Sequence, residues 1–406
     1  MTVVPAGVLP PVDLSVADIL YGSRATSFRF EILTHDSSTG VDSLAGYLDG
    51  VQPSGGLEWV SGRAKSGTMS VQDVPVAKAG LTRIADVDLL TARIRPVRVI
   101  EGLPETPLGV YVLNAQPEKW SGTGRTYELI LTDKSTVLEQ DAVAESFTAG
   151  TADPILEIVA DVISSAGETI SLDGSDTRTL SVERTWEAGT SKLQIVNDLL
   201  TESLGYFALR VNGQGSFRAE PYVEPSKRSV KYSGLNYADG TPLRRELRDG
   251  PLSIYLPDWT LDRVSYDIPN RVIAVASGTG DGPALSGSAT NTNPASPYST
   301  VSRGRVITPK DGPLVVDVPD MSGEADPAAA TVAFLEAAAL RSLIARSSRQ
   351  ASVEVEHLPV PCEILDAFEF ANVPAGVDAV HTLRSTSIPF TFDGKQKSVL
   401  SEVVSL

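Results

Sequence analysis

Metal binding is the first chemistry to consider, because three histidines and one cysteine carry the imidazole and thiolate groups that bind zinc and similar ions. His35, His357, His381 and Cys362 lie far apart and show none of the spacings of known zinc sites. Cys362 is the only cysteine, so no disulfide can form within the chain, and a disulfide-stapled secreted scaffold is excluded. We predict no metal ligand.

Phosphate binding and nucleophilic catalysis have equally little support. The segment "SGTGDG" (277–282) has the order G-x-G-x-G, whereas a dinucleotide-binding loop has G-x-G-x-x-G. The residues that follow predict no helix whose N-terminus holds a phosphate. No serine lies in a G-x-S-x-G motif, and no cysteine–histidine signature is present. We therefore predict no cofactor and no nucleophile.

A pair of carboxylates is harder to judge, because a glycosidase needs only two acids that meet in space. Among the 51 acidic residues, Asp86 lies close to Asp88 and Asp173 lies close to Asp176. Both pairs fall in predicted turns, where aspartate is common because its side chain bonds to the nearby backbone. We predict no catalytic residue, although a pair formed by distant parts of the chain stays open.

Aromatic residues, which line many sugar-binding clefts, make up only 6% of the chain and form no cluster. We predict that the scattered tryptophans anchor cores or interfaces. They are Trp59, Trp120, Trp186 and Trp259.

Three arginines in "RIRPVRV" (93–99) allow two interpretations. Arg93, Arg95 and Arg98 either bind an anion or form the solvated face of a strand. Pro96 lacks the N–H that a central strand uses, which favours an edge strand or a bulge. We predict the solvated face.

The charge balance opposes nucleic-acid binding, since the net charge is −17 and nucleic-acid binders present basic patches. The N-terminal "MTVVPAGVLPPVDL" lacks the basic start of a signal peptide and contains three prolines. No stretch approaches the roughly 18 apolar residues that a membrane-spanning helix needs. We expect a soluble protein made in a cytosol, with no membrane anchor.

Alternating apolar residues predict strands from residue 24 to about 140, as in "RTYELILTD" (125–133). An α+β insert with two helices on a small antiparallel sheet follows. Its first helix has Asp153 as N-cap and Pro154 at the first helical position, and it ends before Gly167. The second helix opens with the capping box of Ser191 and Gln194 and ends at Gly205, and it leads into a hairpin that turns at 212–215.

Strands return after residue 255. A segment rich in Gly, Ser, Thr, Asn and Pro (278–300) predicts a long mobile loop, because it holds too few apolar residues to build a core. A helix then begins with Asp326 as its cap and Pro327 at its first position. Asp393-Gly394 predicts the turn of a last hairpin. No repeat of fixed period is visible.

This order of elements resembles the hub protein of a bacteriophage tail tip or baseplate, in the minor tail protein group of actinobacterial phages. The resemblance covers roughly residues 20–406 and rests on element order and on the helix–Gly–strand–turn–strand unit at 193–222. The segments that carry it are "PLGVYVLNAQPEKWSGTGRTYELILTDKSTVLEQ", "LQIVNDLLTESLGYFALRVNGQGSFRAEPY", "YDIPNRVIAVAS" and "ASVEVEHLPVPCEILDAFEFAN".

The resemblance implies an α+β, mainly β fold, with two tube-like β-barrel or sandwich domains flanking an α+β insert. The expected boundaries are 1–140, 141–255 and 256–406, with the loop at 278–300 in the last domain. It also implies a homotrimer without enzymatic activity that presents six β domains around a channel for DNA. The implied partners are the tail tube or distal tail protein, the tape measure protein, and distal tip or receptor-binding proteins. The implied location is the tail tip of a virion, after assembly in the host cytoplasm.

Two other functions stay open. One is a tail-associated enzyme that degrades the cell wall, either a glycosidase or a peptidase. The other is a carbohydrate- or receptor-binding module, which would expose an aromatic patch on a loop. The 278–300 segment offers only Tyr298, which disfavours that function.

Overall fold

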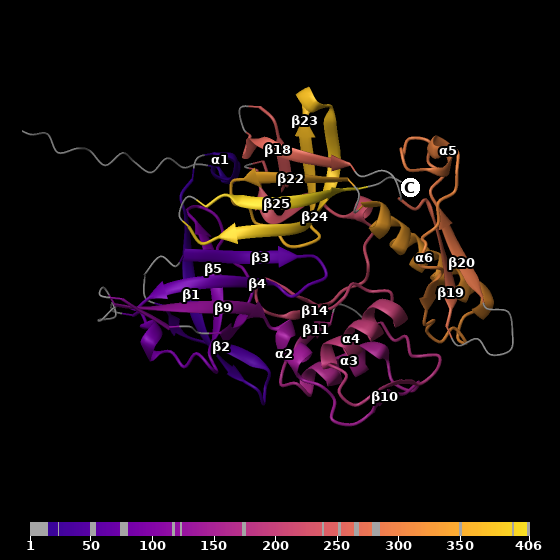
Figure 1. Cartoon of the computed structure of the whole chain (residues 1–406), viewed down its shortest axis with the longest axis horizontal. Helices are drawn as coiled ribbons and strands as arrows, with labels where there is room; N and C mark the ends of the chain where they lie inside the picture. The colour runs from indigo at the N-terminus through magenta and orange to yellow at the C-terminus, as the bar shows by residue number, and fades with distance from the viewer. Residues whose placement is uncertain are drawn as a thin grey trace, which may run out of the picture.

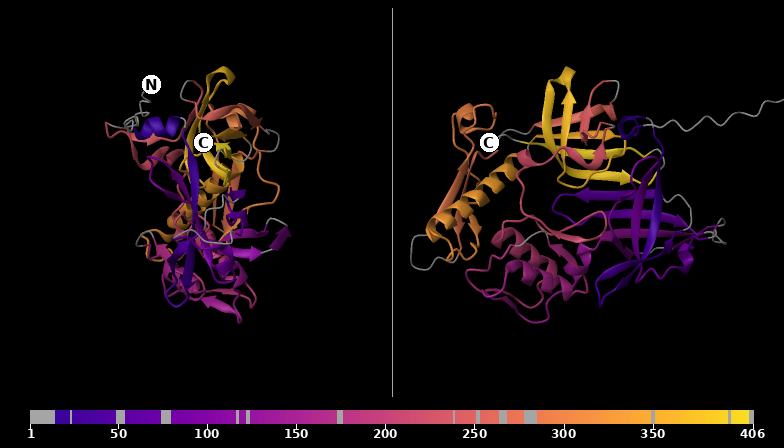
Figure 2. Two further views of the ribbon diagram at one scale, coloured as in Figure 1. Left: turned by 90° about the vertical axis from the view of Figure 1, so that its left-hand side faces the viewer. Right: turned by 180° about the vertical axis from the view of Figure 1, so that it is seen from behind.

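The computed structural model forms the predicted α+β, mainly β fold. Two β modules lie one above the other, a helical insert lies below them, and a small side unit extends to one side (Figure 1). The view from behind shows the same arrangement (Figure 2). The described residues are 15–22, 24–48, 54–73, 80–115, 118–121, 124–172, 176–237, 239–250, 253–263, 268–277, 285–348, 351–391 and 394–403.

The first β module (26–133) follows a short helix, α1 (Val16–Tyr21), which Ser15 caps. Alternation sets its core: in the last strand Tyr127, Leu129 and Leu131 are buried, as the sequence predicts. Its elements are β1 (Thr26–Asp36), β2 (Val41–Tyr47), β3 (Ser54–Val60), β4 (Ser66–Gln72), η1 (Ile84–Asp86), β5 (Arg93–Ile100), β6 (Thr106–Pro107), β7 (Tyr111–Ala115), β8 (Glu118–Ser121) and β9 (Gly124–Asp133).

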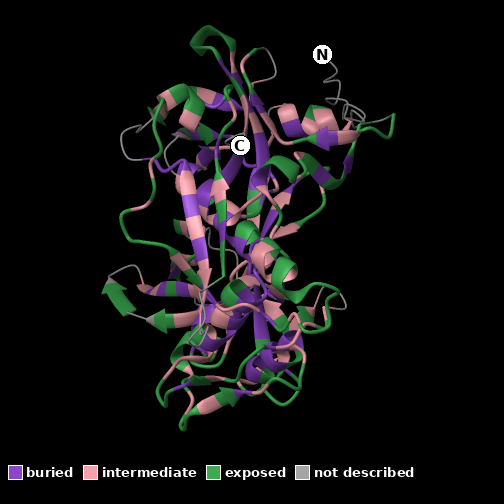
Figure 3. Ribbon diagram, turned by 90° about the vertical axis from the view of Figure 1, so that its right-hand side faces the viewer, coloured by how far each residue is buried: buried purple, intermediate pink, exposed green. Residues whose placement is uncertain are grey.

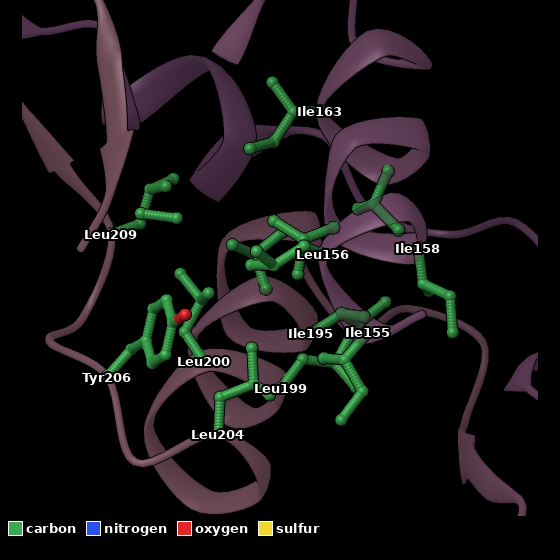
Figure 4. Close-up of a cluster of buried hydrophobic side chains, with 14 of the residues drawn as sticks. Ile155, Leu156, Ile158, Ile163, Ile195, Leu199, Leu200, Leu204, Tyr206 and Leu209 are labelled. Atoms are coloured by element: carbon green, nitrogen blue, oxygen red, sulfur yellow. The ribbon is translucent and has the colours of Figure 1, made fainter. Parts of the chain in front are cut away.

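The insert (135–222) has a core of its own, in which side chains from its helices point toward one another (Figure 4). The predicted apolar stripe of its longest helix is buried. Its elements are α2 (Ser135–Gln140), β10 (Phe147–Ala149), α3 (Ile155–Ser164), β11 (Ile170–Leu172), β12 (Arg184–Trp186), α4 (Lys192–Asp198), the π-helical turn η2 (Leu199–Ser203), β13 (Arg210–Val211) and β14 (Phe217–Ala219).

The helix caps of the insert agree with the sequence only in part. Ser191 accepts a hydrogen bond from the Gln194 N–H, as predicted for the start of α4. The cap predicted for α3 is wrong by one residue, because Pro154 has an extended ψ of 136° and takes the N-cap position itself. Asp153 therefore lies outside the helix.

The predicted hairpin forms, but its strands are short. Ser216 O accepts from the Asn212 N–H across the turn, and Gly215 has a φ of +86°, which favours glycine. β14 pairs antiparallel with β13 and parallel with β11. The sheet is therefore mixed, and the prediction of a purely antiparallel sheet is wrong.

The second β module (231–263 and 351–402) has a separate core. Residues 232–247, which the sequence grouped with the insert, contribute Tyr232, Leu243 and Leu247 to this core. Its elements, after η3 (Pro225–Lys227), are β15 (Lys231–Asn236), β16 (Pro242–Arg244), β17 (Glu246–Arg248), β18 (Tyr255–Arg263), β22 (Ala351–His357), β23 (Ala367–Asn372), η4 (Val373–Ala375), β24 (Val377–Pro389) and β25 (Gln396–Glu402).

The side unit (268–348) corrects the prediction of a structureless loop at 278–300. Residues 286–290 form a strand, and Tyr298 is buried. Buried Asn270 holds this segment by hydrogen bonds to backbone: its side chain accepts from the Ile307 N–H and donates to the Arg305 carbonyl. Residues 278–284 lie outside the described residues. The elements are β19 (Arg271–Ala276), β20 (Ser286–Thr290), α5 (Thr300–Arg303), β21 (Leu314–Val316) and α6 (Pro327–Ser348).

Helix α6 begins as predicted, with the Asp326 carboxylate accepting from the Ala329 N–H. One sequence expectation is wrong here, because Pro327–Ser347 is long and apolar enough to cross a membrane by length and composition, with a mean hydropathy of 1.5. In the structure, Leu335, Ala339 and Leu343 of this helix are buried with Val272 and other side chains of the small sheet.

The two β modules repeat one antiparallel arrangement of five strands. Neighbours run β3-β4-β9-β7-β5 in the first module and β18-β22-β25-β24-β23 in the second. One rung consists of Leu57, Gly67, Leu131 and Leu113, and its counterpart consists of Leu261, Val353, Leu400 and Leu383.

Even the irregularities of the two modules coincide. The register of β7 against β9 shifts between Leu113 and Ala115, and that of β24 against β25 shifts between Leu383 and Ser385. A β-bulge of this kind bends a strand at a defined place. The shared position makes the two modules structural copies of one unit, although the sequence shows no repeat.

The modules join edge to edge through β3 and the end of β24. Leu57 pairs with Ile388, and both are buried. The Phe390 N–H donates to the Gly55 carbonyl at 2.9 Å, and the Phe390 ring packs in the core of the first module, 5.1 Å from the ring of Phe30. Buried segments run through both modules and hairpin ends are exposed (Figure 3). One sheet therefore spans two cores.

Candidate functional site: a basic cleft and the buried charges around it

A cleft of about 750 Å³ opens where the first module, the insert, α6 and the second module meet. Basic side chains outnumber acidic ones along its lining, although the chain as a whole is acidic. The basic residues are Arg63, Lys65, Arg210, Arg218, Arg228 and Arg384, and the acidic residues are Asp133, Glu220 and Glu363.

The turn of the insert hairpin borders this cleft and touches both β modules. The Gly109 N–H donates to the Gly213 carbonyl at 2.8 Å, and the Gly213 N–H donates to a Glu363 carboxylate oxygen at 3.0 Å. A Cβ on Gly213 would lie 2.3 Å from the carbonyl oxygen of Pro107. The close approach requires glycine, so the turn fixes the position of the insert.

Lys65 is the most deeply buried cation of the cleft. Its ammonium donates to the Val211 carbonyl at 2.8 Å and lies 4.4 Å from the centre of the Trp59 ring. Burial lowers the pKa of Lys65, and the nearby Glu363 and Asp133 carboxylates oppose that shift. The side chain thus ties the first module to the insert hairpin.

Two arginines close the opposite wall of the cleft by bonding to backbone of the second module. Arg210 donates to the Ile364 carbonyl at 3.3 Å, and Arg228 donates to the Leu365 carbonyl at 3.1 Å. Burial lowers the pKa of Arg228 to about 10. Both guanidinium groups lie over the Phe207 ring, at 5.0 and 5.3 Å. Arg210 also pairs with Glu220, so its charge is balanced within the chain.

A cluster of buried charges joins the first module to the insert. Glu168, which is fully buried, pairs with Arg93 at 2.5 Å and with Lys134 at 2.7 Å. Asp42 lies 2.9 Å from both of these cations and also 2.9 Å from Nδ1 of His35. Burial would raise the pKa of Asp42, but Lys134 and Arg93 hold it below its usual value. Each charge has an opposite partner, as burial requires.

The prediction of a solvated arginine face is wrong for two of its three members. Arg93 and Arg98 are buried, and Arg98 donates to the Val360 carbonyl at 2.6 Å. Arg95 is partly exposed and pairs with Glu31 at 2.5 Å. β5 is also not an edge, since β1 pairs along one side and β6 and β7 pair along the other. The Pro96 carbonyl accepts a hydrogen bond from the Leu108 N–H.

The remaining metal-ligand types are packed in the second module. Burial lowers the pKa of His357 to about 4 and raises that of Cys362 to about 11. His381 is buried as well, and its Nδ1 lies 2.9 Å from the Ala379 carbonyl. Within the described parts of the chain, no three His, Cys, Asp or Glu side chains gather as a metal site.

The acidic pairs occupy different surroundings. Asp88 accepts hydrogen bonds from the Thr91 hydroxyl and the backbone of residue 90, so it is a turn residue as predicted. Asp86 is exposed in η1. Hydrogen bonds from Arg178 lower the pKa of Asp176 to about 2. Asp173 lies outside the described residues.

The tryptophans divide into core and surface. Trp59 and Trp186 are buried, and Trp259 is partly buried against Phe370, with ring centres 5.0 Å apart. These three confirm the predicted core role. Trp120 instead is 71% exposed on β8, stacked against the Arg125 guanidinium at 4.1 Å.

Sequence reasoning missed four charged residues that hold the junctions together. Lys65, Lys134, Glu168 and Glu363 stand in no motif, and each acts through a partner that is distant in sequence. No local signal marks them.

No family model matches the chain, and no curated protein matches it. Solved structures do. A tail protein from Neisseria meningitidis is similar with a TM-score of 0.57 at 12% identity, over 93% of this chain and 98% of that one. The 43 kDa tail protein of prophage MuSo2 from Shewanella oneidensis gives 0.55 at 12% identity with the same coverage.

A more distant likeness is to a chain of the Francisella PdpA–VgrG complex, with a TM-score of 0.50 at 8% identity. The match covers 94% of this chain and 53% of the other. At such identities the likeness shows a shared fold. This chain therefore has the fold of phage tail proteins, along nearly its full described length.

Proposed function

We propose that this protein is the structural hub of a phage tail tip, of the kind found in actinobacterial phages, and that it has no enzymatic role. Its fold supports the proposal, because tail proteins share it over 93% of the chain. The charged groups described above also favour it, since they hold modules together in buried pairs and carbonyl contacts.

The hub is a homotrimer in this proposal, and the repeat of strand order and register in the two β modules is the observation that carries it. Three chains with two equivalent modules each present six similar units, which matches a six-fold tube to a three-fold tip. Closed symmetric rings form when one interface repeats until it meets itself.

The partners follow from this position. The ring joins the tail tube or distal tail protein on one side to distal tip or receptor-binding proteins on the other. The tape measure protein and then DNA pass through its centre. A net charge of −17 suits a channel in which DNA slides without binding.

Light scattering on the purified protein tests the proposal. We expect a mass three times that of one chain, and we expect no clearing of host cell walls in a zymogram. A mass of one chain over the whole accessible concentration range would contradict the ring. A cleared band would instead favour a cell-wall-degrading enzyme.

A further inference from the structure

Several strands of the β modules pair on one side only in the described structure, among them β2, β8 and β18. β18 pairs only with β22, and β8 pairs only with β9. β8 also carries Trp120, which is 71% exposed. An open edge offers unpaired N–H and C=O groups. The Trp120 ring stacks on the Arg125 guanidinium but leaves most of its surface exposed beside this edge.

The repeat of strand order in the two β modules indicates which strand pairs with β8 and which with β18. β3 and β18 hold equivalent places, since each is the first strand of the shared order. β7 continues past its bulge into β8 along β9, as β24 continues past its bulge along β25 toward residue 389. β8 is therefore the counterpart of the end of β24, which is the segment that pairs with β3.

We propose that β18 of one copy pairs antiparallel with β8 of the next copy, repeating between chains the junction that β3 and β24 make within one chain. This inference rests on the proposed trimer and names the surfaces that close it. Alternating in-chain and between-chain junctions then give six equivalent contacts around the ring.

The register of β8 against β18 follows from the register of β24 against β3 within the chain. Pro389 lies opposite Gly56 in the chain, and the shared registers make Lys119 equivalent to Pro389 and Thr260 equivalent to Gly56. Lys119 of one copy thus faces Thr260 of the next. Asp262, two residues along β18, lies diagonal to Lys119, and such opposite charges attract across strands.

Trp120 acquires a role in this interface. Its counterpart is Phe390, whose N–H bonds to the Gly55 carbonyl and whose ring is buried in the neighbouring module. Trp120 accordingly donates its backbone N–H to the Trp259 carbonyl of the next copy and buries its ring there. Buried tryptophans are frequent anchors of protein interfaces.

A cysteine pair tests the register. In Lys119→Cys/Thr260→Cys, the two thiols of adjacent copies meet at a position without cross-strand hydrogen bonds, where Cα atoms are about 4.5 Å apart and a disulfide fits. We expect mild oxidation to produce covalently linked trimers on a non-reducing gel. Native Cys362 is buried and does not compete.

The matched control is Lys119→Cys/Leu44→Cys, which pairs the same position with an exposed residue of another edge strand, β2. It should give no linked trimer. A second variant, Trp120→Ala, should weaken trimer association by roughly tenfold or more.

The outcomes separate the two proposals. A trimer by mass that does not crosslink at 119 and 260, or that associates normally without Trp120, overturns the inference and leaves the hub intact. A monomer by mass in the unmodified protein overturns both. A linked trimer in the test pair alone supports the β8·β18 contact.

Discussion

At the scale of single residues, Glu168 is the point on which the first module and the insert depend. Its carboxylate is fully buried and lies between the Arg93 guanidinium and the Lys134 ammonium. Replacing a whole buried ion network with apolar residues is often neutral, whereas removing one member leaves unpaired charge behind. The network therefore fixes the docking of the insert more than it adds stability.

Neutralising the Glu168 carboxylate alone should destabilise the protein, because it removes one member of the network and leaves the others in place. Glu168→Gln keeps the size of the side chain but leaves two buried cations with only Asp42 to balance them. We expect the free energy of unfolding in urea to fall by about 3 kcal/mol. The control is Glu157→Gln, at an exposed position of α3, which should change it by less than about 0.5 kcal/mol. Equal effects of the two changes would contradict the network.

The residue scale also shows what a sequence withholds. His35, Asp42, Arg93, Lys134 and Glu168 meet in space, yet they are spread over more than a hundred positions. The arginines were predicted to be solvated because Pro96 favours an edge strand or a bulge, and the partners that bury Arg93 and Arg98 come from other segments. The turn role of Asp88 was within reach, since it depends on nearby residues.

At the scale of elements, the hairpin turn at 212–215 is a docking device. Gly213 accepts from the Gly109 N–H of the first module, donates to Glu363 of the second, and leaves no room for a side chain. Because it contacts both β modules, the turn fixes the orientation of the insert relative to them.

A methyl group at this turn should loosen the docking. In Gly213→Ala the new Cβ meets the Pro107 carbonyl at 2.3 Å, so backbone has to move. We expect a loss of about 1–3 kcal/mol in unfolding free energy. Gly150→Ala is the control, because no atom lies within 4 Å of a Cβ placed there. If the two variants are equally stable, the turn is not a tight contact.

Local chemistry predicted the elements well where it acts over a few residues. The stripe of α3, the Ser191 and Asp326 caps and the 212–215 turn depend on neighbouring residues, and all are present. The strand at 286–290 was missed because its own residues are small and polar, and it is held by pairing with β19 and by packing against α6, both distant in sequence. Helix α6 was predicted from its cap and first proline, but the sequence analysis overlooked that it is long and apolar enough to span a membrane.

At the scale of the whole molecule, the duplication of the β module is the main structural fact that the sequence conceals. Equivalent rungs keep register but not residue type, as Gly67 and Val353 show. The leucines of this rung do coincide, for example Leu131 and Leu400. Many types of side chain fit a half-buried position of a pleated sheet. The two modules can therefore share the same strand register although their residues differ.

The junction of β3 with β24 predicts that both modules unfold together. Ile388→Ala removes a buried side chain that pairs with Leu57, and such truncations cost about 2–5 kcal/mol. Because one sheet spans both cores, hydrogen exchange should accelerate to the same extent in β4 of the first module and β25 of the second. Val373→Ala, at a residue 77% exposed, should leave both unchanged. Faster exchange in the second module alone would mean that the modules are independent and merely adjacent, and the in-chain junction would then be a poor template for a ring.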